Sequence, residues 1–432
     1  MKNRTAILTV MLAVICSVQQ SYAQDPRELI AANPDRLGGV HHAYEEPSTI
    51  ADTPAPKGFK PFYISHYGRH GSRYMFDTAK QDKVLSVLDP IAADGLLTDE
   101  GLTMYRDFKA LREAHEGMAG YLTQRGAAEH RGIAHRMLKR FPQVFRQKDR
   151  QEVVAVSSTI QRCLQSMANF IGQLRSEYPG LEVSMYSGPR YMTGILHDSS
   201  KKKDLLLQRS IIDSTLNVRF FPERLMTAWF KDTAAVKKHF DGYDARHLIY
   251  DIYFESCIAQ CLDEELPTAL SLMTEDELFN LWYADNMRVL NGECLTLEND
   301  SFRAETASYI LKDILDKADE ALADGSSRAA DLRFGHDSGL MPLLALMGIE
   351  GYPIRSIRGA SDPGGLFVFN TMPMGSSLQM VFYRNRKGEV LVKFIRNEAE
   401  TAIPDLKPFS GPYYKWSEAR EYLSGKIIIF AP

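Results

Sequence analysis

Residues 62–76 read FYISHYGRHGSRYMF, and they are the most informative stretch of the sequence. Its apolar start, Phe62-Tyr63-Ile64, predicts a strand that leads into Arg69-His70-Gly71-Ser72-Arg73. Guanidinium groups match the oxygens of a phosphate, so Arg69 and Arg73 are expected to bind an oxyanion. Gly71 allows a tight turn or a close approach to a ligand, and His70 is placed to attack the group that the arginines hold. The alternative is a strand end whose arginines are merely solvated.

A second junction between a strand and a helix lies in residues 151–175. Residues 153–156 (VVAV) predict a buried parallel strand, and Ser157, Ser158 and Thr159 are residue types that cap helices. An apolar stripe at helical spacing follows, made of Ile160, Leu164, Met167, Ile171 and Leu174. Arg162 falls in the first turn of this helix, off the stripe, where a cation favours anion binding more than helix stability. A surface ion pair is the alternative role for Arg162.

A third junction lies in residues 330–348. Residues 332–334 predict a short strand, residues 335–339 (GHDSG) a turn, and residues 340–347 a buried helix that ends at Gly348. His336 can donate to an anion, and Asp337 can give a proton to a leaving group, although it can also simply cap the helix. His197-Asp198 repeats the dipeptide, but it precedes a polar stretch, residues 199–203, that is expected to form a loop.

The three junctions are expected to form one site. In open α/β sheets, ligands bind at the carboxyl ends of the strands. Three such ends carry Arg-His-x-x-Arg, Arg and His-Asp, and one shared site explains them better than three coincidences.

The N-terminus predicts export. Lys2 and Arg4 precede an apolar stretch, and Ser21-Tyr22-Ala23 fits a cleavage site, so residues 1–23 are expected to be a secretory signal peptide. Lipidation at Cys16 is a weaker alternative, because Ile15 stands where a small residue is preferred. Without this segment the formal net charge changes from −4 to −6, which disfavours nucleic-acid binding. No other stretch has the length and apolarity of a transmembrane helix.

The cysteines and the paired histidines give no clear prediction. After signal cleavage four cysteines remain, which allow three full pairings: Cys163, Cys257, Cys261 and Cys294. Cys257 and Cys261 would share a face of a helix and could bond or pack. His41 and His42 would point to opposite sides of an extended chain, so a metal site there is disfavoured.

The three motifs resemble those of a known family. Arg69-His70-Gly71-Ser72-Arg73 resembles the RHGxRxP signature of the histidine acid phosphatases, within the histidine phosphatase superfamily, with Met75 in place of the proline. Gly335-His336-Asp337 resembles the family's proton-donor dipeptide, and Arg162 falls where the family places a third phosphate-binding arginine. Residues 122–142 are similar to its LTxxG helix, and residues 377–398 to its C-terminal strand pair. The likeness touches most of residues 58–400.

The resemblance implies an α/β fold with a three-layer core, in which helices flank a mainly parallel sheet, plus a smaller, mostly helical cap domain. It implies that His70 attacks phosphorus to form a phosphohistidine and that Asp337 protonates the departing alcohol. The phosphate oxygens would be bound by Arg69, Arg73, Arg162 and His336. The partner would be a small-molecule phosphomonoester, and no metal or cofactor is implied.

The substrate stays open on this resemblance. The sequences RHGSRY and VLVKFIRNE are similar to those of the multiple inositol-polyphosphate phosphatases, which usually carry His-Ala-Glu as the donor motif. His336-Asp337 is instead the form typical of bacterial and fungal phytases and acid phosphatases. The expected activity is therefore that of an exported, periplasmic or secreted acid phosphatase, with inositol phosphates as candidate substrates.

The expected domains are a discontinuous core, residues 24–175 and 300–432, and a cap, residues 176–299. Lys201-Lys202-Lys203 would be an anion-attracting surface on the cap or, more simply, a solvated run. Two rival functions remain. A phosphoglycerate-mutase-like phosphotransferase shares the Arg-His-Gly opening but fits a signal peptide poorly. A non-catalytic exported anion-binding protein would tolerate the loss of His70 or Asp337, and both are present.

Overall fold

The computed structural model describes residues 25–147, 151–196, 201–240, 242–296, 300–352, 354 and 365–428. The expected signal peptide, the alternative of lipidation at Cys16 and the dipeptide His197-Asp198 lie outside these residues. Within them, no helix is long and apolar enough to cross a membrane.

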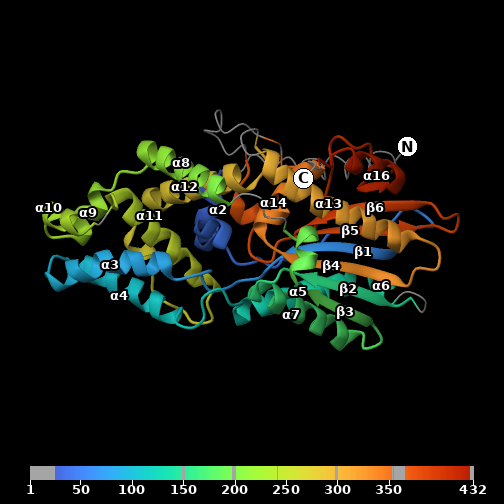
Figure 1. Cartoon of the computed structure of the whole chain (residues 1–432), viewed down its shortest axis with the longest axis horizontal. Coiled ribbons are helices and arrows are strands. Elements are labelled where there is room, and N and C mark those ends of the chain that lie inside the picture. The colour runs from blue at the N-terminus through green and yellow to red at the C-terminus, as the bar shows by residue number, and fades with distance from the viewer. Residues whose placement is uncertain are drawn as a thin grey trace, which may run out of the picture.

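One sheet forms the centre of the larger lobe (Figure 1). In the described residues its strand order is β3-β2-β4-β1-β5-β6-β7, and β8 pairs with β6. The four strands from β3 to β1 are parallel, whereas the later strands of the chain pair in antiparallel fashion. The strands are β1 (Lys60–Arg69), β2 (Glu152–Ser157), β3 (Glu182–Ser187), β4 (Arg328–Gly335), β5 (Ser377–Arg384), β6 (Val390–Arg396), β7 (Ala399–Thr401) and β8 (Tyr413–Lys415).

Helices cover both faces of this sheet, which confirms the predicted three-layer core (Figure 1). One face carries α5 (Gln124–Arg140), α6 (Pro142–Phe145) and α7 (Gln161–Glu177), and the other carries α13 (Asp300–Leu322), α14 (Asp337–Met347) and α16 (Trp416–Ser424). Side chains alternate along β1 as expected for a strand. Ile64 packs in the core below α5 and α7, whereas Tyr63 and Tyr67 pack in the core formed with α13 and α14.

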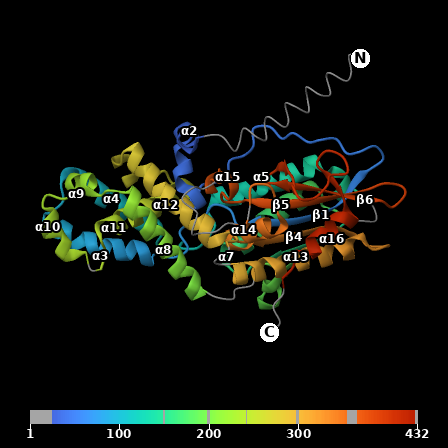
Figure 2. The same ribbon diagram turned by 90° about the horizontal axis from the view of Figure 1, so that it is seen from above.

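A helical region extends from one end of the sheet (Figures 1 and 2). Its core contains large buried side chains such as Phe108, Trp229, Tyr250 and Trp282. The helices are α3 (Ala79–Ala93), α4 (Asp99–Ala114), α8 (Lys201–Arg219), α9 (Glu223–Trp229), α10 (Thr233–Val236), α11 (Ala245–Ser256) and α12 (Glu275–Glu293). The region therefore includes α3 and α4, which precede residue 176, while β3, which follows it, belongs to the sheet. The division into core and cap domains stays a prediction.

Shorter helical segments complete the two regions. They are α2 (Pro26–Ala32), η1 (Pro34–His41), η2 (Pro189–Gly194), η3 (Lys237–His239), η4 (Cys257–Cys261), η5 (Ala269–Leu272) and α15 (Val368–Thr371). Of these, η1 packs against α12, α15 and η4, and it lies close to the carboxyl end of β1.

The predicted strands and the helix of the third junction are present but longer than expected, and α14 already begins at Asp337, inside the expected turn of residues 335–339. The strands at residues 62–64, 153–156 and 332–334 are parts of β1, β2 and β4. The helix α14 ends at Gly348, whose φ of 70° is the left-handed conformation that glycine tolerates. The loop expected at residues 199–203 is wrong in part, because α8 begins at Lys201.

No disulfide joins the four cysteines that the structure describes, and all four are buried. Cys257 and Cys261 pack rather than bond: their thiols lie 3.6 Å from the carbonyl of Leu37 and 3.0 Å from that of His41. The predicted capping of α7 by residues 157–159 is wrong, because Ile160 is its N-cap and makes no side-chain cap bond.

Candidate active site

The carboxyl ends of three parallel strands bring the predicted motifs together. In the register of the sheet, Arg69 at the end of β1 lies opposite Gly335 at the end of β4. Just after β1, the N–H of His70 donates to the carbonyl of Gly335 on β4 at 3.0 Å. Just after β2, the N–H of Ser158 donates to the carbonyl of Phe334 on β4 at 2.9 Å. The three motifs therefore lie together at the end of the sheet where these strands have their carboxyl ends, as the sequence predicted.

His70 is held in a tautomer that leaves Nε2 free to react. Its Nδ1 lies 3.0 Å from the carbonyl oxygen of Gly71, which can only accept, so Nδ1 carries the proton. Burial and the charges of Arg162, Arg69 and Arg73 hold the pKa of His70 well below its usual value. A buried, neutral imidazole with an available nitrogen is the state that a nucleophilic histidine requires.

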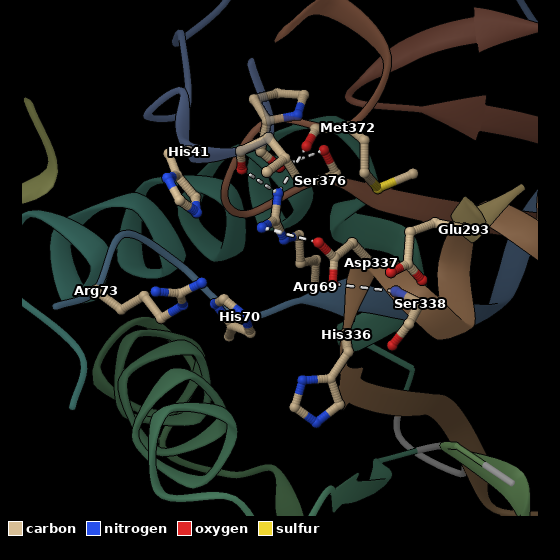
Figure 3. Close-up of polar contacts among 12 residues, drawn as sticks. His41, Arg69, His70, Arg73, Glu293, His336, Asp337, Ser338, Met372 and Ser376 are labelled. Carbon is tan, nitrogen blue, oxygen red and sulfur yellow. Dashed lines mark hydrogen bonds and ion pairs between the residues drawn. The ribbon is translucent and has the colours of Figure 1, made fainter. Parts of the chain in front are cut away.

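Arg69 connects the site to two backbone segments and to Asp337 (Figure 3). Its Nη1 donates to the carbonyls of Val40 at 2.9 Å and Met372 at 2.7 Å, and its Nη2 lies 3.1 Å from Oδ2 of Asp337. The backbone N–H of Ser338 donates to the other carboxylate oxygen at 3.0 Å. Although burial raises the pKa of Asp337, Arg69 and its other positive neighbours hold this pKa below the usual range. Asp337 is the first residue of α14 rather than its N-cap.

The arginines retain donors for an anion. In the described part of the chain, the Nε atoms of Arg69, Arg73 and Arg162 are buried and have no hydrogen-bond partner. Burial and mutual repulsion lower the pKa of Arg73 to about 9, so it stays charged near neutral pH. An unpartnered buried donor costs free energy, and a bound oxyanion would remove this cost.

His336 lies behind this surface. Its ring stacks edge-on against His70 with the centroids 5.7 Å apart, and its Nε2 lies 2.9 Å from Oγ of Ser158. Cys163 Sγ is 3.6 Å from the same nitrogen. Burial, followed by the charge of Arg162, lowers the pKa of His336 to about 3, so this ring is neutral. Ser158, which the sequence suggested as a helix cap, instead contacts this histidine.

Two glycines and a buried carboxylate position the loop that carries His70 and Arg73. A Cβ atom on Gly71 would lie 2.6 Å from the carbonyl oxygen of Gly126, and one on Gly126 would lie 2.1 Å from that of Ser72. The loop and the first turn of α5 therefore approach more closely than side chains allow. From the next turn, Glu129 accepts hydrogen bonds from Ser72 N–H at 2.8 Å, Ser72 Oγ at 2.6 Å and Tyr44 N–H at 3.1 Å. No motif in the sequence marks Glu129.

The site opens into a cavity of about 660 Å³ between the sheet and the helical region. Of the six predicted site residues, His70, Arg73, Arg162 and Asp337 line it, whereas Arg69 and His336 lie directly behind. The opposite wall is cationic and comes from α3, α8 and α12: Lys80, Lys83, Arg209 and Arg288. Lys80 pairs with Asp251 and Arg288 with Asp285, but among the described residues Lys83 and Arg209 make no ion pair. These four residues could not be predicted from the sequence, because no local motif marks them.

Comparison with known proteins gives structural matches alone. No family model and no curated protein match the sequence. The structure of the Bifidobacterium longum multiple inositol polyphosphate phosphatase in complex with inositol hexasulfate matches with a TM-score of 0.77 at 19% identity, over 92% of this chain and 99% of that one. The same phosphatase in complex with phosphate gives 0.78 at 17% identity, with the same coverage.

Phytases match as well. The phytase from D. castellii has a TM-score of 0.66 at 14% identity, over 91% of this chain and 85% of its own. The Hafnia alvei phytase in its apo form has a TM-score of 0.54 at 13% identity, over 87% of this chain and 98% of its own. The protein therefore has the mixed α/β fold of these inositol-phosphate phosphatases and phytases, which is the fold that its resemblance to the histidine acid phosphatases implied.

Proposed function

We propose that the protein is a phosphomonoesterase that works through a phosphohistidine. In the first step, Nε2 of His70 attacks phosphorus while the bond to the ester oxygen breaks. Asp337 gives its proton to the departing oxygen, so that an alcohol leaves. The positive charge of Arg69, Arg73 and Arg162 offsets the negative charge on the three equatorial oxygens of the transferred group, the task that metal ions perform in other phosphoryl-transfer sites.

In the second step, water attacks the phosphorus of the phosphohistidine. The carboxylate of Asp337 accepts the proton of the water, the N–P bond breaks, and His70 returns to its starting state. One residue acts as acid and then as base, so its protonation state is correct for each half-reaction. The hydrogen bond from Nδ1 of His70 to Gly71 keeps the ring in one orientation throughout.

The observation that carries this proposal is the state of His70. The ring is buried, neutral and tautomerically fixed in a site where several guanidinium donors have no partner. A protein that only binds anions gains nothing from a reactive nitrogen in this place. The low pKa of His70 also supports activity in mildly acidic solution, since the nucleophile stays unprotonated there.

We further propose inositol phosphates as the substrate class, supported by the size and charge of the cavity. A volume of about 660 Å³ accommodates far more than one phosphate. Lys83 and Arg209 provide positive charge on the wall opposite His70, where additional phosphates of the same molecule would lie. The matched B. longum enzyme was captured with inositol hexasulfate, which has this polyanionic character. The sequence of residues 1–23 supports export.

Phosphate release tests the function directly. The purified protein is assayed with p-nitrophenyl phosphate and with inositol hexakisphosphate, in the presence of EDTA, and each reaction is quenched to look for a phosphoprotein. Free phosphate and an acid-labile phosphoprotein are expected. Transfer of the phosphoryl group to a second sugar phosphate without net release would indicate a mutase. Tight binding of both compounds without turnover would indicate an anion-binding protein.

A further inference from the structure

His41 is a buried histidine at the wall of the catalytic cavity for which the proposed reaction has no role. It is the last residue of η1, its exposed fraction is only 2%, and it lines the same cavity as His70 and Asp337. In the described structure its Nδ1 is buried and has no hydrogen-bond partner. Figure 3 shows its ring on the same side of the site as the guanidinium groups of Arg69 and Arg73.

The backbone around His41 is fixed relative to the phosphate-binding arginines. The carbonyl of the preceding residue, Val40, accepts the hydrogen bond from Nη1 of Arg69 at 2.9 Å. The carbonyl of His41 itself lies 3.0 Å from Sγ of Cys261. The ring packs against Phe254 of α11, with the centroids 4.6 Å apart. These contacts on both sides keep the imidazole at the cavity wall rather than free to turn away.

The charges around His41 are mostly positive, and they come from several elements. Burial, followed by Arg73, Arg69 and Arg288, lowers the pKa of His41 well below its usual value, and Asp337 acts in the opposite direction. His41 is therefore neutral in the free protein. A neutral imidazole with an unpartnered nitrogen, beside guanidinium groups that also have unpartnered donors, can bind the same anion as those groups.

We propose that His41 is a further phosphate-binding residue of this site, and that it takes up a proton when the substrate's phosphate binds between it and the arginines. The inference rests on the proposed function for the identity of the ligand. A phosphate would offset the positive charge of Arg69 and Arg73 and place negative charge beside the ring. Both effects favour the imidazolium form, which donates the stronger, charge-assisted hydrogen bond.

The neighbouring residue provides a matched control. His42 is equally buried, but it does not line the cavity, and both of its ring nitrogens have partners. Its Nε2 lies 2.9 Å from Glu45, and its Nδ1 lies 3.0 Å from the side chain of Gln260 and 3.1 Å from the carbonyl of Asp35. Changing His42 therefore removes a buried histidine of the same segment without removing one from the cavity.

The test is calorimetric binding of inositol hexasulfate between pH 5.5 and 8, in buffers with different ionisation enthalpies. Sulfate esters do not titrate in this range, so any proton uptake belongs to the protein. His41→Asn, which can donate but does not titrate there, should weaken binding roughly tenfold at pH 5.5. It should also lower the measured proton uptake and flatten the pH dependence of the affinity. His42→Asn should leave the uptake unchanged.

Unchanged affinity and uptake in His41→Asn would overturn the proposal. A loss of affinity with unchanged proton uptake would overturn the claim that His41 is protonated when the anion binds. An equal loss of affinity in His42→Asn would overturn the assigned contact, because it would show a general effect on η1. Thermal unfolding of both variants verifies that they fold, and histidine ring NMR follows His41 directly if stability falls. Because binding needs no turnover, this result is independent of the proposed function: absence of hydrolysis by the wild-type protein would refute that function alone.

Discussion

Oδ2 of Asp337 lies 3.1 Å from Nη2 of Arg69, and a quarter of the Asp337 side-chain surface is exposed. The group proposed to donate a proton is thus paired with a group proposed to bind the phosphate. In the free protein this pairing keeps the pKa of Asp337 low, so the carboxyl is ionised. A bound phosphate competes for Arg69 and brings negative charge close to Asp337, and both effects raise the pKa of the carboxyl. Substrate binding would therefore create the acid that the first step needs.

The first prediction concerns Asp337→Asn. Turnover of alkyl phosphates should fall by about 10²–10⁴-fold, because the basic alkoxide then leaves without a proton. Phosphoryl transfer from p-nitrophenyl phosphate to His70 should slow much less, since p-nitrophenolate leaves readily on its own. Hydrolysis of the phosphohistidine should slow equally for both substrates, because the same carboxylate is the base of the second step. The basic limb of the pH profile of phosphoryl transfer should disappear, because transfer in the wild-type protein is lost as Asp337 deprotonates in the complex. Rapid-quench measurement of alcohol release in the first turnover separates the two steps, and equal losses for both substrates in that turnover would argue against proton donation.

The second prediction concerns His70→Ala. Turnover should be abolished, because the attacking nitrogen is gone, while inositol hexasulfate should still bind through the unchanged arginines. Rapid quenching with labelled substrate should trap a phosphoprotein in the wild-type protein only. The surface variant His135→Ala is the control, because this histidine is 39% exposed and pairs with Glu177 outside the site. Persistent labelling of His70→Ala would identify a different nucleophile.

The parts of the site that lie next to strands could be predicted from the sequence. Arg69 and Gly335 end adjacent parallel strands, so each motif follows directly from an apolar run, and the register of the sheet aligns them. The helix that carries Arg162 could be predicted from the helical spacing of its apolar residues. The positions of these residues could be predicted from the local apolar pattern and the geometry of a parallel sheet, because each of them lies within a few residues of a strand end.

The remaining parts depend on contacts between distant segments. Lys83 and Arg209 reach one cavity wall from helices more than a hundred residues apart in sequence, and no local pattern encodes that approach. Ile160 continues the apolar stripe of α7, yet it is 41% exposed, because the helix begins one residue later. The N–H of Ile160 instead donates to Ser158 Oγ, the hydroxyl that also contacts His336. The chemistry of the site, rather than helix capping, determines the role of that serine.

The third prediction concerns Glu129, which accepts three hydrogen bonds from Ser72 and Tyr44. Glu129→Gln keeps the shape but places an amide N–H₂ against N–H or O–H donors, so it should lower stability by about 1–3 kcal/mol. It should also lower kcat/KM, because the loop between His70 and Arg73 loses its support. Ser72→Ala removes only the hydroxyl bond and should do less. A fall in Tm with unchanged kcat/KM would restrict Glu129 to a stabilising role.

The fourth prediction concerns the cationic wall. Lys83→Gln and Arg209→Gln should each raise KM for inositol hexakisphosphate about fivefold at low salt, because a charge pair near a surface contributes on the order of 1 kcal/mol. KM for p-nitrophenyl phosphate, which has one phosphate, should change little. Lys237→Gln is the control, since it removes the same charge from an exposed position outside the cavity. Equal changes of KM for both substrates would mean that Lys83 and Arg209 do not support the proposal of a polyanionic substrate.

The last prediction concerns the stability of the protein in acid, to which two buried histidines outside the candidate site, His66 and His130, should contribute. His66 on β1 packs against Phe170 and Phe334, and His130 on α5 packs against the same two rings. In the described structure none of their four ring nitrogens has a hydrogen-bond partner. Burial lowers the pKa of each histidine to about 3, and for His66 the neighbouring His130 adds to this effect.

The unfolded chain therefore binds more protons than the folded protein between about pH 3 and the unfolded pKa of about 6.5. Stability should be fully present above pH 6.5 and should fall as the pH decreases, by roughly 1.4 kcal/mol per pH unit for each histidine. His66→Phe, which retains an aromatic ring among the phenylalanines, should reduce this slope by one such increment. Urea unfolding from pH 4.5 to 8 measures the dependence of the free energy of unfolding on pH. The difference in this free energy between the wild-type protein and the variant at pH 8, where both histidines are neutral, reports the change in packing alone. An unchanged slope in His66→Phe would mean that His66 does not limit acid stability.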